Sequence, residues 1–103
     1  MIQVIAIITA KPGKRNAILE AICANLPAVR AERGCIEYGP SVDADGIGQF
    51  QTKAGPDIIF LIEKWADADA LKAHTVTPHM AAYIEEVKDF VANRLIHVLS
   101  PVA

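Results

Sequence analysis

The sequence lacks the features of a membrane-spanning protein and of a nucleic-acid-binding protein. The longest apolar run near its start covers only residues 2–10, whereas a transmembrane helix needs roughly 20 residues. The 10 Lys and Arg are scattered among 12 Asp and Glu, which leaves no basic stripe for a nucleic acid. There is also no Gly-rich phosphate loop. We therefore expect no membrane or nucleic-acid partner.

Cysteines and aromatic residues are scarce as well. Cys23 and Cys35 form no CxxC motif, which favours reduced thiols in a cytoplasmic protein. Aromatic residues make up only 6% of the chain, so the 52% hydrophobic fraction consists mainly of Ala, Ile, Val and Leu. A single domain of 103 residues has too little interior to bury all of this apolar surface. We therefore expect a homodimer in which two copies cover an apolar face of each other.

Short segments rich in β-branched and apolar residues predict four strands. We expect them at residues 2–9, 35–42, 58–65 and 95–99. Residues 43–57 contain several glycines and a proline and predict a long loop, in which residues 49–52 are a candidate extension of the flanking strands.

Helices are predicted between these strands from spacing and capping signals. Apolar residues at three- and four-residue spacing indicate a helix from Ile18 to Val29. We expect it to break at Pro27, which cannot donate to the helix ladder, and the segment to end at Gly34. Asp67 is a typical N-cap of a short second helix. Thr77-Pro78 is a start signal for a third, whose apolar face we expect to reach Val91.

The order strand, helix, strand, strand, helix, strand predicts an α+β, ferredoxin-like βαββαβ sheet with its helices on one face. The other face would then be bare and apolar. Two copies that pack these faces together would form a dimeric α+β barrel.

Four segments in this order resemble the antibiotic biosynthesis monooxygenase family, and the resemblance covers nearly the whole chain. The matching segments are Ala10-Lys11-Pro12-Gly13-Lys14-Arg15, Glu32-Arg33-Gly34-Cys35-Ile36-Glu37-Tyr38, Glu63-Lys64-Trp65-Ala66-Asp67 and Ala73-His74-Thr75-Val76-Thr77-Pro78-His79.

The resemblance implies a cofactor-independent monooxygenase that oxidises a small quinol- or anthrone-like aromatic with dioxygen. The haem-degrading branch of the family has a catalytic asparagine where this chain has Ile5-Ala6-Ile7, and a tryptophan where it has His74, which argues against haem. The loop at 43–57 looks longer than the hairpin usual in the family. Two other functions fit the same resemblance: an isomerase or tautomerase acting on a small hydroxyketone, and a non-catalytic ligand-binding or stress-response module.

His79 and His74 are the first two candidate catalytic residues. His79 follows Pro78 at the positive end of a helix dipole, which favours a neutral imidazole that can accept a proton. His74 ends the preceding helix, where it is either a catalyst or a helix cap. An exposed surface imidazole remains the alternative for His79. Their spacing does not place both on one helix face and no third ligand is evident, so we expect no metal site.

Glu63 is the third candidate catalytic residue because it shares strand parity with apolar neighbours. A carboxylate there must be paired or have a raised pKa. It therefore acts as a base, orients a histidine, or pairs with a cation at the dimer interface. Trp65, Tyr38 and Tyr83 are candidates for substrate binding, with core packing as the alternative for each. We expect His97 to be a strand or interface histidine.

Overall fold

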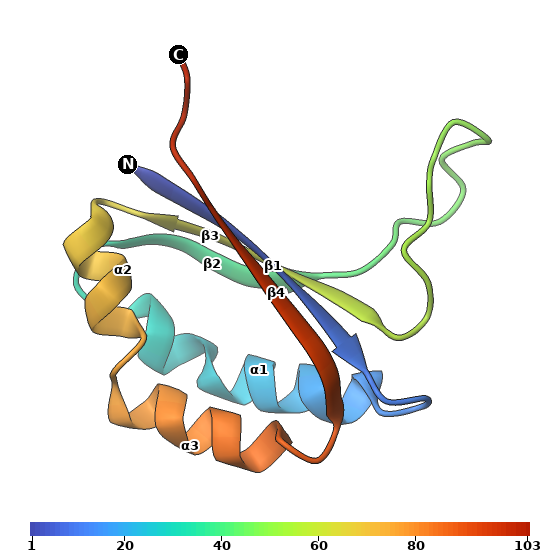
Figure 1. The fold of residues 1–103 in the computed structure, drawn as a ribbon, viewed down its shortest axis with the longest axis horizontal. Helices are drawn as coiled ribbons and strands as arrows, with labels where there is room; N and C mark the ends of the chain where they lie inside the picture. Colours follow the sequence, from blue (N-terminus) through green and yellow to red (C-terminus); the bar gives the residue numbers. More distant parts are fainter.

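Four strands and three helices form the domain in the computed structural model, which describes residues 1–103 (Figure 1). In chain order these are β1 (Ile2–Ala10), α1 (Arg15–Arg30), β2 (Cys35–Ser41), β3 (Ile58–Trp65), α2 (Ala68–His74), α3 (Pro78–Val87) and β4 (Val91–Leu99). The strands form one antiparallel sheet in the order β2-β3-β1-β4, and the helices cover one of its faces. The predicted ferredoxin-like α+β fold is confirmed. No helix combines the length and apolar character needed to span a membrane.

The core lies between the sheet and the helices. Strand β1 alternates, with Val4, Ala6 and Ile8 buried toward the helices and the residues between them on the opposite face. In the β1–β3 pairing, Val4 lies opposite Glu63 and Ala6 lies opposite Leu61. Since directly opposed residues point to the same face of a sheet, Glu63 lies on the helix-covered face with Val4. This register puts a carboxyl group into an otherwise apolar layer.

The predicted break at Pro27 is wrong, because α1 continues through it to Arg30. Proline leaves the carbonyl four residues earlier without a helical donor, and that carbonyl belongs to Cys23, which is exposed and accessible to water. Beyond the proline, Val29 is fully buried, so continuing the helix stabilises the core. Ala31, rather than Gly34, is the helix C-cap.

Gly34 instead closes the turn between α1 and β2. Its φ of +82° lies in the left-handed region that favours glycine. A Cβ at this position would lie 2.5 Å from the Cβ of Ala70 in α2, so only glycine allows this close approach. The turn that carries Glu32 is thereby packed against α2.

The last strand begins earlier than predicted, at Val91 rather than residue 95. Helix α3 ends at Val87, so Phe90 and Val91 do not extend it. The reason is the length of β1, whose residues from Gln3 to Ala10 pair with β4 from Leu99 back to Val91. Val91 therefore joins β4 by pairing with β1, although its spacing also fits the apolar face of a helix.

The segment between β2 and β3 is a long loop that extends away from the sheet (Figure 1). The candidate strand extension at residues 49–52 is not formed. The carboxylate of Asp43 holds the loop ends together by accepting from the backbone N–H groups of Ala54 (3.0 Å) and Gly55 (2.9 Å). These two hydrogen bonds lower the pKa of Asp43.

Candidate active site

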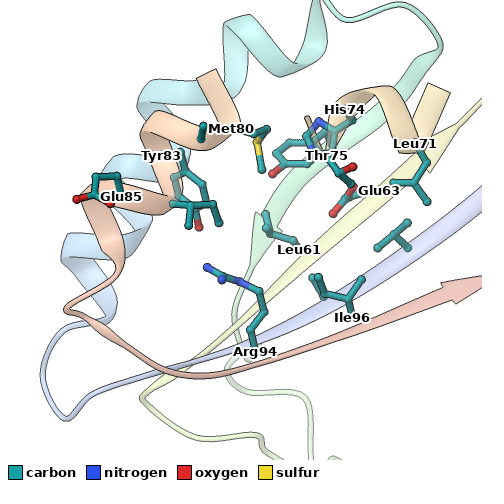
Figure 2. Close-up of a pocket in the computed structure, with 15 residues that line it drawn as sticks. Leu61, Glu63, Leu71, His74, Thr75, Met80, Tyr83, Glu85, Arg94 and Ile96 are labelled. Carbon is teal, nitrogen blue, oxygen red and sulfur yellow. The ribbon is translucent and has the colours of Figure 1, made fainter. Parts of the chain in front are cut away.

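A cavity of about 460 Å³ lies between the helix-covered face of the sheet and helices α2 and α3 (Figure 2). Most of its lining is apolar, and the polar groups are few. The lining residues are Val4, Ala6, Tyr38, Leu61, Glu63, Leu71, His74, Thr75, Met80, Ala81, Tyr83, Ile84, Glu85, Arg94 and Ile96. A concave, mostly apolar site with a small number of polar groups is typical of small-molecule binding.

Glu63 contributes a carboxyl group to this cavity from strand β3. The residue is only 6% exposed, and its Oε1 accepts a hydrogen bond from Trp65 Nε1 at 2.9 Å. This is the only hydrogen bond that the protein makes to the carboxyl group, so the second oxygen is free. Burial raises the pKa of Glu63, although the Trp65 hydrogen bond and the nearby His74 oppose the rise. The cavity thus contains a proton-accepting group that is easier to protonate than an ordinary carboxylate.

His74 lies beside Glu63 in the cavity wall (Figure 2). It is the last residue of α2, a helix whose predicted N-cap is confirmed, since the Asp67 side chain accepts from Ala70 N at 2.8 Å. The imidazole is 4% exposed and packs with its ring centroid 4.6 Å from that of Trp65. Its position therefore depends on both the helix end and the core.

The tautomer of His74 follows from its partner. Nδ1 lies 2.9 Å from Oε2 of Glu32, and an ionised carboxylate can only accept hydrogen bonds, so Nδ1 carries the hydrogen. In the neutral ring, Nε2 is then left with a lone pair. His74 thus has a carboxylate that orients it, as histidine bases have in many enzymes.

His79 binds the same carboxylate from the other side. The predicted start of α3 is confirmed, because Thr77 accepts from Met80 N at 3.3 Å and Pro78 is the first helical residue. His79 Nε2 lies 2.7 Å from Glu32 Oε2, and its side chain is 29% exposed. It does not line the main cavity and borders a hollow between α1 and α3 instead. His79 therefore reaches the cavity only through Glu32 and His74.

Glu32 is the functional candidate that sequence reasoning missed, because the segment containing it was interpreted simply as the end of a helix. Its side chain is 11% exposed and accepts from both histidines. Glu32 is distant from both in sequence, so no local pattern connects them. The only signal was its place within a segment that resembles the family. Despite their proximity, these three residues are not arranged as a group that could hold a metal ion.

The three candidate substrate-binding aromatics lie in different places. Tyr38 and Tyr83 line the cavity, whereas Trp65 is fully buried behind it and contacts Glu63 through its indole N–H. The Tyr38 ring lies 5.4 Å from the His74 ring, and burial raises the pKa of the Tyr38 hydroxyl. The Tyr38 hydroxyl therefore keeps its proton at physiological pH and can donate a hydrogen bond.

Residues 1–86 match the family named antibiotic biosynthesis monooxygenase. The chain belongs to this family. It is 43% identical over 103 residues to the probable quinol monooxygenase YgiN of Escherichia coli K12, and the match covers 98% of each chain. The resemblance seen in the sequence is thereby confirmed, and it supports a monooxygenase-like function at the level of the family.

Solved structures agree with the observed fold. PA3566 from Pseudomonas aeruginosa superposes with a TM-score of 0.81 at 28% identity and covers 99% of this chain and 94% of its own. A putative antibiotic biosynthesis monooxygenase from Nitrosomonas europaea superposes with a TM-score of 0.83, with complete coverage of both chains. At 22% identity, the second shows the likeness of fold alone.

Two further polar residues of this family member lie away from the Glu63 end of the cavity. Arg94 extends from β4 into the cavity and points toward Tyr83 of α3 (Figure 2). Arg94 was not singled out from the sequence because the strand was expected to begin after it; its parity with Ile96 was the available signal. His97 has the other parity and is exposed on the helix-free face of the sheet.

Proposed function

We propose that this chain is a cofactor-independent monooxygenase that oxidises a small quinol- or anthrone-like aromatic with dioxygen. The observation that carries the proposal is the buried carboxyl group of Glu63 in an otherwise apolar cavity of about 460 Å³. That volume falls in the range of roughly 300–1,000 Å³ typical of pockets for small molecules. A flat aromatic ring gains free energy by leaving water for such a lining.

Glu63 is the proposed base. Its free oxygen takes the proton from the acidic hydroxyl or methylene group of the substrate. Burial raises the pKa of Glu63 toward neutrality, which makes the carboxylate a better proton acceptor. The hydrogen bond from Trp65 fixes the other oxygen and so limits the rotation of the carboxyl group.

His74 and Tyr38 are the proposed partners of the substrate oxygen beside Glu63. The lone pair on His74 Nε2 accepts a hydrogen bond or proton from a substrate hydroxyl, while the Tyr38 hydroxyl donates to the oxygen that becomes negative. Glu32 and His79 are proposed as positioning residues, because they hold the His74 ring without reaching the cavity themselves.

The substrate supplies the electrons in this proposal. The anion of a quinol gives one electron to dioxygen, and recombination of the two radicals forms a carbon–oxygen bond. Cleavage of the O–O bond then leaves one oxygen atom in the product and releases the other as water. A quinol and O₂ thus become a hydroxyquinone and H₂O, so that atoms and electrons balance.

We also propose that the chain is a homodimer formed through the helix-free face of the sheet. This face carries apolar side chains from several strands: Ile5, Ile7, Phe60, Ile62, Leu95 and Leu99. Ile5, Ile62 and Leu95 are 37%, 38% and 49% exposed, although Ile5 and Ile62 lie on the two interior strands of the sheet. A second copy that covers this face would remove a contiguous apolar patch from water.

Oxygen uptake with reduced menadione and with anthrones tests the proposed reaction. We expect uptake above the rate of autoxidation, with one atom of ¹⁸O₂ in the product. The Glu63→Gln variant retains an acceptor for Trp65 but no base, so kcat should fall by roughly 10²–10⁴. The exposed Glu20→Gln variant is the matched control. Uptake no faster than in buffer with all of these substrates would contradict the proposal.

An isomerase or tautomerase is the second candidate, favoured by the presence of both Glu63 and His74 in one cavity. Two groups that bind protons are able to move a proton between adjacent carbons of a hydroxyketone without oxygen. Solvent deuterium exchange into small hydroxyketones under nitrogen separates the two reactions. Exchange that is abolished in Glu63→Gln would support the isomerase, and its absence would leave the oxygenase alone.

A further inference from the structure

Two buried polar atoms in the cavity have no hydrogen-bond partner: Tyr83 Oη and Arg94 Nη2. Tyr83 is 4% exposed, so its hydroxyl has little access to water. An unsatisfied buried polar group costs roughly 1–3 kcal/mol, and more when the group is charged. Two such groups that face the same cavity from different elements indicate a site for an atom that the protein itself does not supply.

The charge at this end of the cavity is positive and unpaired. Arginine is protonated at all physiological pH values, and Arg94 forms no ion pair with any carboxylate of the protein. The acidic residue of the lining nearest in sequence, Glu85, has a largely exposed side chain and pairs with Lys88. A buried charge without a counter-ion is costly, so an anion bound beside the guanidinium would stabilise this end of the cavity.

The Tyr83 hydroxyl and the Arg94 guanidinium can both donate hydrogen bonds to an anion. The guanidinium donates only, and burial raises the pKa of Tyr83 so that its hydroxyl keeps its proton. The positive charge of Arg94 and the nearness of its N–H donors to the hydroxyl both oppose that rise, but the pKa of Tyr83 remains raised. Two donors carried by two different elements match the two oxygens of a carboxylate.

The anion-binding pair lies away from the proposed base. Figure 2 shows Tyr83 and Arg94 at one end of the cavity and Glu63 with His74 at the other, with Leu61 between them. We propose that Tyr83 and Arg94 bind a carboxylate substituent of the substrate, so that the protein prefers acidic hydroxy-aromatics over neutral ones. The inference relies on the proposed function only for the claim that the bound ring is the reacting molecule.

Binding of inert aromatic probes tests this subsite without any turnover. We expect 2-naphthoate to bind to the full chain about 10- to 100-fold more tightly than the neutral 2-naphthamide, as measured by calorimetry, because charged hydrogen bonds contribute that much. Arg94→Met should abolish the difference, and Tyr83→Phe should reduce it several-fold. Arg33→Met, at an exposed position, is the matched control and should leave it unchanged.

Equal binding of the two probes to the wild type, or an unchanged preference in Arg94→Met, would overturn the subsite. If Arg94→Met does not fold, Tyr83→Phe provides the same comparison with a smaller change in volume. Oxygen uptake with a neutral quinol separates the two proposals. A wild type that shows no carboxylate preference but retains uptake rejects the subsite alone, whereas a wild type that shows the preference without any uptake rejects the oxygenase alone.

Discussion

Glu32 Oε2 lies 2.9 Å from His74 Nδ1, and this contact joins the turn after α1 to the end of α2. It assigns the hydrogen of the ring to Nδ1 and leaves Nε2 free for the cavity. The same oxygen accepts from His79, so that a single carboxylate holds two histidines.

The contact predicts that Glu32→Gln impairs catalysis without removing the base. A carboxamide can donate as well as accept, so it no longer enforces the Nδ1–H tautomer of His74. We expect kcat to fall about tenfold, which is less than the roughly 10²–10⁴ that a general acid–base group itself contributes. Long-range ¹H–¹⁵N spectra of the His74 ring should show a mixture of tautomers. A single unchanged tautomer with normal kcat would contradict this role, and Glu20→Gln is the control.

Glu63 predicts a characteristic dependence of stability on pH. Because burial raises its pKa above the ordinary value of 4.5, the folded protein binds this proton more tightly than the unfolded chain does. The contribution of Glu63 to stability therefore falls as pH rises from about that value through the raised pKa. Glu63→Gln, which stays neutral, should become more stable than the wild type as pH increases across this window. Urea denaturation at several pH values measures the difference, and a constant difference would disprove the assignment.

The proposed dimer predicts that a charge on the helix-free face releases monomers. Leu95→Glu puts a carboxylate in the apolar patch opposite Ile7, where a partner would have to bury it. Light scattering coupled to size exclusion should show the mass of two chains for the wild type and of one for the variant. Val76→Glu alters an equally apolar, exposed residue on the helix side and should leave the dimer intact. A monomeric wild type would end this proposal.

The turn at Gly34 predicts a pair of glycine substitutions with unequal effects. Gly34→Ala combines a positive φ with a Cβ placed 2.5 Å from Ala70 Cβ, whereas Gly13→Ala has a similar φ of +76° and open space around it. Both substitutions lose roughly 1–2 kcal/mol to backbone strain. Gly34→Ala should lose about 1–3 kcal/mol more to the clash, as measured by chemical denaturation. Equal losses would show that α2 moves away freely.

Local patterns were sufficient for strand β3 and for the starts of helices α2 and α3. Strand β3 was predicted at its observed limits because its run of apolar residues ends at a charged and aromatic pair. The caps Asp67 and Thr77 were predicted correctly, since capping involves residues three positions apart. Pro27 shows the limit of such local reasoning, because a distant packing partner outweighs one missing hydrogen bond.

The sequence by itself therefore determined the family, the fold and the fact that Glu63 shares a strand face with apolar neighbours. These follow from the two-residue repeat of strands, the helical repeat, and the order of the segments that resemble the family, all of which can be identified in the linear sequence. Only the tertiary structure decided that Glu32 holds both histidines, that His79 lies outside the cavity and that Arg94 faces Tyr83. These relationships join elements far apart in sequence, and their geometry depends on how helices pack on the sheet.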